Sequence, residues 1–173
     1  MAVVGTSGAG KSTLAASLAR RLSVPHVELD GLFHLPGWVP RETGEFRELV
    51  GKALAGPGFV VDGNYTLVSD LVLERADTVI WLDLPRYVVM AQVMARSLRR
   101  VVTRQELWNG NRETWSNLLR LDPERSIVVW SFTRHAHYKA RYEAQLSDPE
   151  VAHLRLIRLR SRREARLLAG ERW

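Results

Sequence analysis

The sequence predicts a single α/β domain, spanning residues 1–173, in which helices cover both faces of a parallel β-sheet. Two observations carry this prediction. Short apolar segments with strand character alternate with segments of helical periodicity along most of the chain. Several of the short segments are continuously apolar, as expected of strands that are buried on both faces. Ligands in such sheets bind beyond the carboxyl ends of the strands, so the residues that follow each strand are the first candidates for a site.

The N-terminal part begins with a strand, a helix and a second strand. Residues 2–4 form a short apolar strand that runs into a glycine-rich turn. A helix is predicted from Lys11 to about Leu22, because apolar residues recur there at helical spacing. These residues are Leu14, Ala15, Leu18, Ala19 and Leu22. Residues 26–29 are expected to form the second strand, which ends at Asp30.

The middle of the chain is expected to contain a helix and two further strands. These elements are the helix 43–55, the strand 59–61 and the strand 78–82. The sequence Gly56-Pro57-Gly58 breaks the helix. Each strand is followed directly by an aspartate, Asp62 in one case and Asp83 in the other. Pro85 then opens a long helix, since proline is favoured in the first turn.

The last third of the chain alternates less regularly. A strand is predicted over residues 154–159 and a closing helix over residues 161–168. Residues 138–146 are expected to be helical. Residues 101–124 are polar, carry Arg and Trp and have little strand signal, which indicates an insertion between the long helix and the next element.

Composition and charge restrict the class of protein. No cysteine occurs, which excludes disulfides and thiolate metal sites. The best apolar stretch, residues 79–95, is broken by Asp83 and Arg86, and the glycine-rich turn begins too early for a leader, so we expect a cytoplasmic protein without a membrane span. The net charge is +6, and all but three of the 25 basic residues are Arg. This charge fits nucleic-acid binding, and it equally fits a site in which bidentate guanidinium groups grip several phosphates.

The glycine-rich turn has the phosphate-loop spacing G-x-x-x-x-G-K-[ST] over residues 5–12. Its glycines let successive amide N–H groups curl around a phosphate at the positive end of the following helix. Lys11 is expected to reach the outer phosphates and Ser12 to give its hydroxyl to Mg²⁺. A chance match in a turn is the alternative, but the strand before and the amphipathic helix after argue against it. The residues expected to bind the nucleoside triphosphate are Gly5, Ser7, Gly8, Ala9, Gly10, Lys11, Ser12 and Thr13.

Three aspartates that follow strands are candidates for the remaining chemistry. Asp62 and Asp83 both fit a carboxylate that holds Mg²⁺ through water, and either could instead cap the next turn. We favour Asp62 for magnesium because Gly63-Asn64-Tyr65 continues into a substrate loop, whereas Asp83 is expected to open the next helix. Asp30 stands where an acceptor hydroxyl would be held and deprotonated. A plain turn residue is the alternative interpretation of Asp30.

Several arginines on the long helix share one face, because they recur at spacings of three and four. They are Arg96, Arg99, Arg100 and Arg104. A solvated face is the usual meaning of such a run. Phosphoryl transfer, however, needs guanidinium groups that neutralise the charge spreading over the transferred group. Our candidates for this catalytic role are Arg96, Arg100 and Arg104.

We interpret residues 101–124 as a lid that closes over the phosphates, because transfer requires that water is excluded. The segment carries Arg104 and Arg112 beside the polar sequence Asn109-Gly110-Asn111. A fixed surface loop, whose apolar side chains pack on the domain, is the alternative.

These motifs resemble the adenylate-kinase-like P-loop proteins, in particular the bacterial branch labelled topology modulation proteins. The matching pieces span most of the chain and comprise residues 4–14, 29–30, 61–65, 80–86 and 159–161. The resemblance implies a three-layer α/β/α fold of the nucleoside-phosphate-kinase type, ATP as the phosphate donor and a mobile lid. It also implies that Arg160, which follows the last strand, lies near the adenine.

Two departures from the family pattern concern the acceptor. Adenylate kinases have Asp-Gly-Phe-Pro-Arg where this chain has Asp62-Gly63-Asn64-Tyr65-Thr66, so an arginine that grips the substrate is missing. Gln92 stands where such kinases commonly have arginine. Both departures argue against AMP as the acceptor.

The motifs and the resemblance lead us to expect an ATP-dependent phosphotransferase. It would move the γ-phosphate of ATP to a nucleotide or to another small acceptor with a hydroxyl or phosphate group. An ATP-binding regulatory or nucleic-acid-associated protein, which hydrolyses ATP slowly and works through a partner, remains the alternative.

Overall fold

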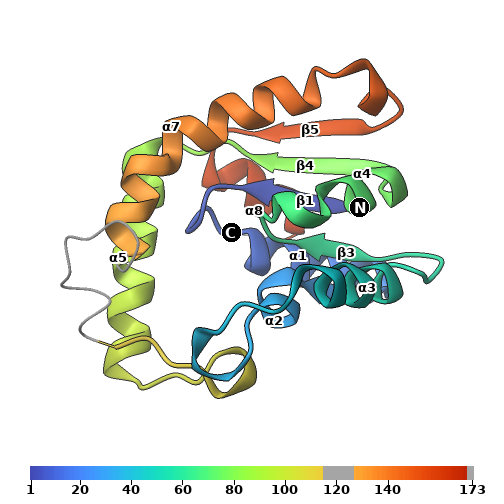
Figure 1. The fold of residues 1–173 in the computed structure, drawn as a ribbon. Helices are drawn as coiled ribbons and strands as arrows, with labels where there is room; N and C mark the ends of the chain where they lie inside the picture. Colours follow the sequence, from blue (N-terminus) through green and yellow to red (C-terminus); the bar gives the residue numbers. More distant parts are fainter. Residues whose placement is uncertain (115–126, 171–173) are drawn as a thin grey trace.

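The strands of the protein form one parallel sheet, shown in Figure 1 for the computed structural model, which describes residues 1–114 and 127–170. Within these residues the sheet has five strands in the order β2-β3-β1-β4-β5. The strands are β1 (Ala2–Gly5), β2 (His26–Glu28), β3 (Val60–Asp62), β4 (Thr78–Leu82) and β5 (Arg155–Leu159). At the centre of the sheet, Ala2 of β1 lies opposite Val61 of β3 and Val79 of β4. Because all neighbouring strands are parallel, their carboxyl ends meet at one edge.

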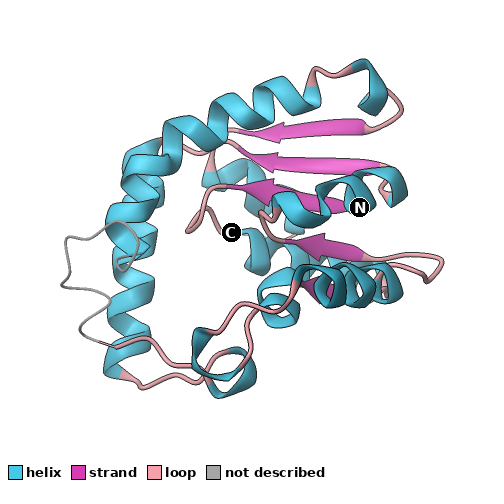
Figure 2. Cartoon of the chain, in the orientation of Figure 1, coloured by secondary structure: helices cyan, strands magenta, loops and turns pink. Residues whose placement is uncertain are grey.

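Helices connect the strands and lie on both sides of the sheet (Figure 2). They are α1 (Lys11–Leu22), α2 (Leu29–Phe33), α3 (Thr43–Ala53), α4 (Ser69–Arg75), α5 (Arg86–Val102), α7 (Ile127–Leu146) and α8 (Arg162–Ala169). Short 3₁₀ turns are η1 (Pro36–Trp38), η2 (Thr66–Val68), η3 (Trp108–Gly110) and η4 (Pro149–Val151).

Each face of the sheet has its own hydrophobic core, because successive strand residues point to opposite faces. Val3 and Ile80 are buried in a core that α1, α5 and α8 complete. Ala2 and Val79 are buried in a second core with residues of α3 and α4. The predicted three-layer α/β/α fold with a parallel sheet is therefore confirmed.

Several predicted element bounds differ from the structure. The strand that was expected to run to Leu29 ends at Glu28, and Asp30 lies in the first turn of the short helix α2 instead of at a strand end. Leu29 is buried as the first residue of α2 and not as the last residue of the strand. Helix α7 begins at Ile127, well before the expected residue 138, and α4 was not expected.

The proposed lid, residues 101–124, lies only partly within the described residues. Residues 101 and 102 are the last two of α5. Residues 103–114 are irregular apart from η3, and residues 115–124 lie outside the described residues. In the part of the chain that the structure describes, no helix is long and apolar enough to cross a membrane.

Candidate functional site

The loop between β1 and α1 is seated tightly against α5. Gly8 has a φ of 84°, and a Cβ at this position would lie 2.1 Å from Cγ2 of Val93. The loop closes on itself through a hydrogen bond of 3.1 Å from the amide of Ala9 to the carbonyl of Thr6. No side chain caps the start of α1 in the described chain, and its first turn has no acidic residue. Its first amide groups are therefore available to an anion.

Lys11 stands where the loop meets two carboxylates. Its Nζ donates a hydrogen bond of 3.2 Å to the carbonyl oxygen of Thr6. Burial lowers the pKa of Lys11, while the negative charges of Asp30 and Asp62 oppose this shift. The ammonium group thus lies within electrostatic reach of both aspartates.

Asp62 is nearly fully buried, with 4% of its surface exposed, and both of its carboxylate oxygens have partners. The hydroxyl of Ser12 donates to Oδ1 over 2.9 Å, and Nε2 of His26 lies 2.7 Å from Oδ2. This hydrogen bond is the main cause of a raised pKa of His26. The sequence analysis missed His26, because only the pairing of β2 with β3 brings this isolated histidine to Asp62.

Ser12 and Asp62 together suit a magnesium ion that is shared with phosphates. A hydroxyl and a carboxylate are hard oxygen donors, which Mg²⁺ takes alongside phosphate oxygens and water. Among the described residues, no group of three or more His, Asp or Glu side chains could hold a metal ion by itself. The donor set therefore fits an ion bound partly by a nucleotide.

Asp83 has a different environment from Asp62. Its Oδ2 accepts hydrogen bonds of 3.0 and 2.6 Å from Nε and Nη2 of Arg158, and Nζ of Lys139 lies 3.7 Å away. Helix α5 has Pro85 as its N-cap residue. The expectation that Asp83 opens the helix is therefore corrected: its carboxylate joins β4 to β5 and α7 by ion pairs.

A cavity of about 770 Å³ lies between the phosphate loop, α2 and α5. This volume is within the usual range for ligand sites, about 300–1,000 Å³. The charged residues that line it are Lys11, Asp30, Asp62, Arg96, Arg100 and Arg162. The loop contributes Ser7, Gly8, Gly10, Ser12 and Thr13. Of the other two predicted loop residues, Ala9 lines an adjoining cavity of about 260 Å³, and Gly5 accepts a hydrogen bond of 2.6 Å from Asn64.

Asp30 lines the cavity from α2 and is held by an aromatic neighbour. The hydroxyl of Tyr65 donates to Oδ1 of Asp30 over 2.6 Å, and Nε2 of His34 lies 3.3 Å from the same hydroxyl. Burial, followed by the charge of Asp30, raises the pKa of Tyr65. The phenol therefore stays protonated and acts as a donor. The residue before Tyr65, Asn64, donates to the carbonyl of Gly5 and accepts from the hydroxyl of Tyr142, so both residues of the expected substrate loop have hydrogen-bond partners.

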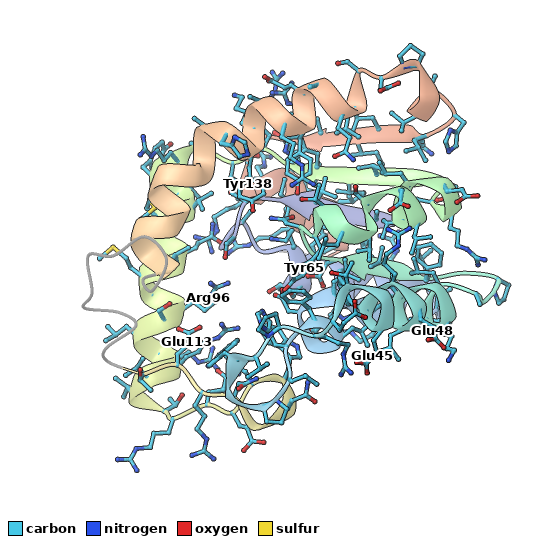
Figure 3. The ribbon with its side chains drawn as sticks, viewed as in Figure 1. Glu45, Glu48, Tyr65, Arg96, Glu113 and Tyr138 are labelled. Atoms are coloured by element: carbon cyan, nitrogen blue, oxygen red, sulfur yellow. The ribbon has the colours of Figure 1, made fainter. Side chains whose placement is uncertain are left out.

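The arginines of α5 have different environments. Arg96 points inward from α5, as Figure 3 shows, and burial lowers its pKa. Its Nε is buried without a hydrogen-bond partner among the described residues. Arg100 forms an ion pair of 2.7 Å with Glu113. Arg104 follows the helix with a φ of 48°, is exposed and does not line the cavity, so the structure does not bring it to the site.

The arginine near the last strand also differs from the expectation. Arg160 is exposed outside the cavity, and its amide donates to Oε2 of Glu164 over 2.8 Å. Arg162, in the first turn of α8, lines both the large and the adjoining cavity. The sequence analysis missed Arg162 because the orientation of α8, which starts after the cap residue Ser161, decides which arginine faces inward.

Residues 103–114 are attached to the segment that follows β2. In Figure 1 the two segments lie side by side, to the right of the lower end of α5. Nε1 of Trp108 donates to Glu28 over 2.9 Å, and Trp108 also lines the cavity. Asn111, with 3% of its surface exposed, accepts from the amide of Trp38 over 2.8 Å and donates to the carbonyl of Leu35 over 3.0 Å. These contacts form one wall of the cavity.

No family model matches the chain. A shikimate kinase of Corynebacterium glutamicum is 36% identical over 96 residues, which are 48% of this chain. The match spans 57% of the length of that kinase. The uncharacterized protein YqaC of Bacillus subtilis is 29% identical over 144 residues, with 80% of each chain covered.

A solved structure of a gluconokinase from Sinorhizobium meliloti has a TM-score of 0.53 and 17% sequence identity. The match covers 98% of this chain and 86% of that chain. At this level of identity the likeness shows a shared fold: the chain has the three-layer fold of a P-loop kinase structure.

Proposed function

We propose that the protein is an ATP-dependent phosphotransferase that moves the γ-phosphate of ATP to a nucleotide or to another small-molecule acceptor. The observation that carries the proposal is the meeting of a phosphate loop, its lysine, a serine–aspartate pair and a second aspartate in one cavity. A loop that only bound phosphate would not require the second aspartate.

The proposal gives each group at the donor end of the cavity a role. The loop amides and the start of α1 bind the phosphates, and Lys11 contacts the outer ones. Ser12 and Asp62 hold Mg²⁺, which neutralises negative charge on the phosphates when it is bound. Arg96 carries a buried positive charge whose Nε has no partner among the described residues, so it suits the charge that develops on the transferred group.

The remaining arginines have conditional roles in the proposal. Arg100 stands beside Arg96, but Glu113 already balances its charge. Arg104 reaches the phosphates only if residues 101–124 close as a lid, and Arg160 only if the end of β5 moves. Arg162 lines the cavity and is therefore a better candidate than Arg160 for contacting the base of the nucleotide.

The comparisons support a kinase with a small acceptor. The shikimate kinase that matches part of the sequence and the gluconokinase that shares the fold are both kinases by name. The proposal includes a cytoplasmic location, where ATP is available. Membership of the topology modulation branch is also part of the proposal, and the sequence motifs alone support it.

The net charge of +6 is the observation that favours a nucleic-acid-associated protein instead. Lys11, Arg96, Arg100 and Arg162 account for part of this charge within the cavity. A nucleic-acid-binding protein would bind arbitrary DNA or RNA with an affinity that falls steeply with salt.

The experiment that tests the function is an acceptor screen with ADP release as the readout. Purified protein, Mg²⁺ and ATP are incubated with nucleoside monophosphates, nucleosides, small sugars, shikimate and gluconate. At least one compound should raise ADP release about tenfold or more above ATP alone, since an oriented acceptor outcompetes water. Stimulation by DNA or RNA only, with salt-dependent binding, would favour the alternative.

A further inference from the structure

The carboxylate of Asp30 has one oxygen engaged and one left available beside the phosphate loop. Oδ1 accepts the hydrogen bond from Tyr65 over 2.6 Å, while no described residue donates to Oδ2. Asp30 lines the same cavity as Lys11 and Arg96. Both cations are close enough to interact electrostatically with Asp30.

The neighbours of Asp30 fix which way its hydrogen bonds run. A tyrosine hydroxyl has one proton, and that of Tyr65 is used toward Asp30. The contact of 3.3 Å between this hydroxyl and Nε2 of His34 therefore requires that Nε2 carries a proton and donates. The chain of donors runs from His34 through Tyr65 to Asp30. It leaves Oδ2 of Asp30 without a donor among the described residues.

The charges on the acceptor side of the cavity are unfavourable for a phosphate group. Lys11 and Arg96 are assigned to ATP and to the transferred group under the proposed function. The charge of Arg100 is balanced by Glu113 at 2.7 Å. Once Lys11 and Arg96 contact ATP, they no longer balance the charge of Asp30 toward the acceptor, and this carboxylate would repel a phosphate monoester.

A carboxylate at this point can assist the attack of an alcohol acceptor, but it does not assist the attack of a phosphate acceptor. A phosphate acceptor attacks with an oxygen that has already lost its proton. An alcohol has a pKa far above neutrality and must lose its proton as it attacks, which a positioned carboxylate assists.

We propose that the acceptor group is an alcohol hydroxyl, which Asp30 holds and deprotonates, and that a nucleoside monophosphate is not the substrate; this inference rests on the proposed function. The hydroxyl oxygen forms a bond to the γ-phosphorus as the bond from that phosphorus to the β–γ bridging oxygen breaks. The bond electrons leave with ADP, and the hydroxyl proton goes to Oδ2 of Asp30. Tyr65 and His34 are positioning residues, because they act through Asp30.

The test uses three named acceptors with the whole protein: water, glycerol and AMP. Turnover is followed by ADP release, and phosphorus NMR distinguishes a phosphate monoester from a diphosphate. Asp30→Asn should lower transfer to water and glycerol about 100-fold, within the usual effect of a general base. Its affinity for Mg²⁺ with a non-hydrolysable ATP analogue should stay within about twofold of wild type. AMP should give no diphosphate beyond the background.

Two further variants distinguish a loss of catalysis from a loss of the folded structure. Asp70→Asn makes the same chemical change at an exposed ion pair with Arg47, and it should leave turnover unchanged. Tyr65→Phe keeps the ring and removes the donor. It should lower kcat about tenfold with little change in KM for MgATP, because the lost contact matters to the acceptor carboxylate and not to ATP binding.

Each contrary outcome identifies what fails. Diphosphate formed from AMP, or wild-type transfer to water by Asp30→Asn, overturns the alcohol inference and leaves the proposed function standing. A wild-type protein that binds no MgATP, or releases no ADP with any of these acceptors or of those in the acceptor screen, overturns the proposed function and this inference together.

Discussion

Asp62 and Asp83 occupy similar positions in the sequence, each directly at the end of an apolar strand, but the fold gives them different partners. Asp62 meets the hydroxyl of Ser12 in the cavity. Asp83 meets the guanidinium of Arg158, which also stacks over the ring of Trp81 at 4.2 Å. Under the proposed function Asp62 serves a metal ion, whereas Asp83 holds two strands and a helix together.

The two carboxylates should therefore respond differently to the same substitution. Asp62→Asn should raise the Mg²⁺ concentration for half-maximal ATP turnover about tenfold, because a charged ligand becomes neutral. Asp83→Asn should leave that concentration unchanged and lower Tm, because Arg158 loses its buried partner. Magnesium titrations of turnover and thermal unfolding of both variants check this. The reverse pair of phenotypes would show that the two aspartates are assigned the wrong way round.

The residues that the sequence predicted best belong to contiguous motifs. Lys11 and Ser12 were found because the phosphate loop has a fixed spacing, and both line the cavity. His26 and Arg162 could not be found in this way, since their positions depend on strand pairing and on the orientation of α8. Asp30 was identified although its predicted element was wrong. A residue that follows β2 reaches the cavity whether it ends the strand or lies in the first turn of α2.

At the scale of elements, the phosphate loop and α5 depend on each other through Gly8. A methyl group at this position would meet Cγ2 of Val93 at 2.1 Å and would also strain a positive φ of 84°. In this conformation the loop leaves no room for a side chain at position 8.

Gly8→Ala should lower the free energy of unfolding by about 2 kcal/mol or more, from overpacking and backbone strain together. It should also weaken MgATP binding, because the loop shifts. Gly51→Ala is the matched control: this residue of α3 has no atom within 4 Å of its added Cβ, and alanine is preferred in helices by about 1 kcal/mol. Urea unfolding of both variants provides the measurement, and equal stabilities would contradict the packing argument.

Residues 103–114 join α5 to the segment after β2, and they are the described part of the proposed lid. Asn109 and Asn111 form most of the hydrogen bonds to that segment, and Trp108 donates to Glu28 at the end of β2. If both segments close over bound ATP, their amide groups should become better protected.

Hydrogen exchange over residues 103–114 should therefore slow when Mg²⁺ and a non-hydrolysable ATP analogue are added. Arg104→Ala should lower turnover more than ATP affinity, because closure would bring its charge to the developing transition state. Unchanged exchange together with wild-type turnover of Arg104→Ala would identify the segment as a fixed wall.

At the scale of the whole molecule, the strand order creates the site. With β1 between β3 and β4, the phosphate loop after β1 lies beside the aspartate that ends β3. The alternation of strands and helices made the parallel sheet predictable. The strand order was not predictable, because the sequence of a short strand does not identify its neighbours, which packing on both faces of the sheet decides.

Lys11 of the phosphate loop is expected to serve ATP turnover, and a pair of lysine variants tests this role. Lys52 is the matched control, because it lies on α3 and forms an exposed ion pair of 2.6 Å with Glu48. ADP release and circular dichroism are measured for both variants. We predict that Lys11→Ala keeps the native spectrum and loses ATP turnover about 100-fold or more, while Lys52→Ala matches wild type. A folded Lys11→Ala variant with near wild-type turnover would contradict the account.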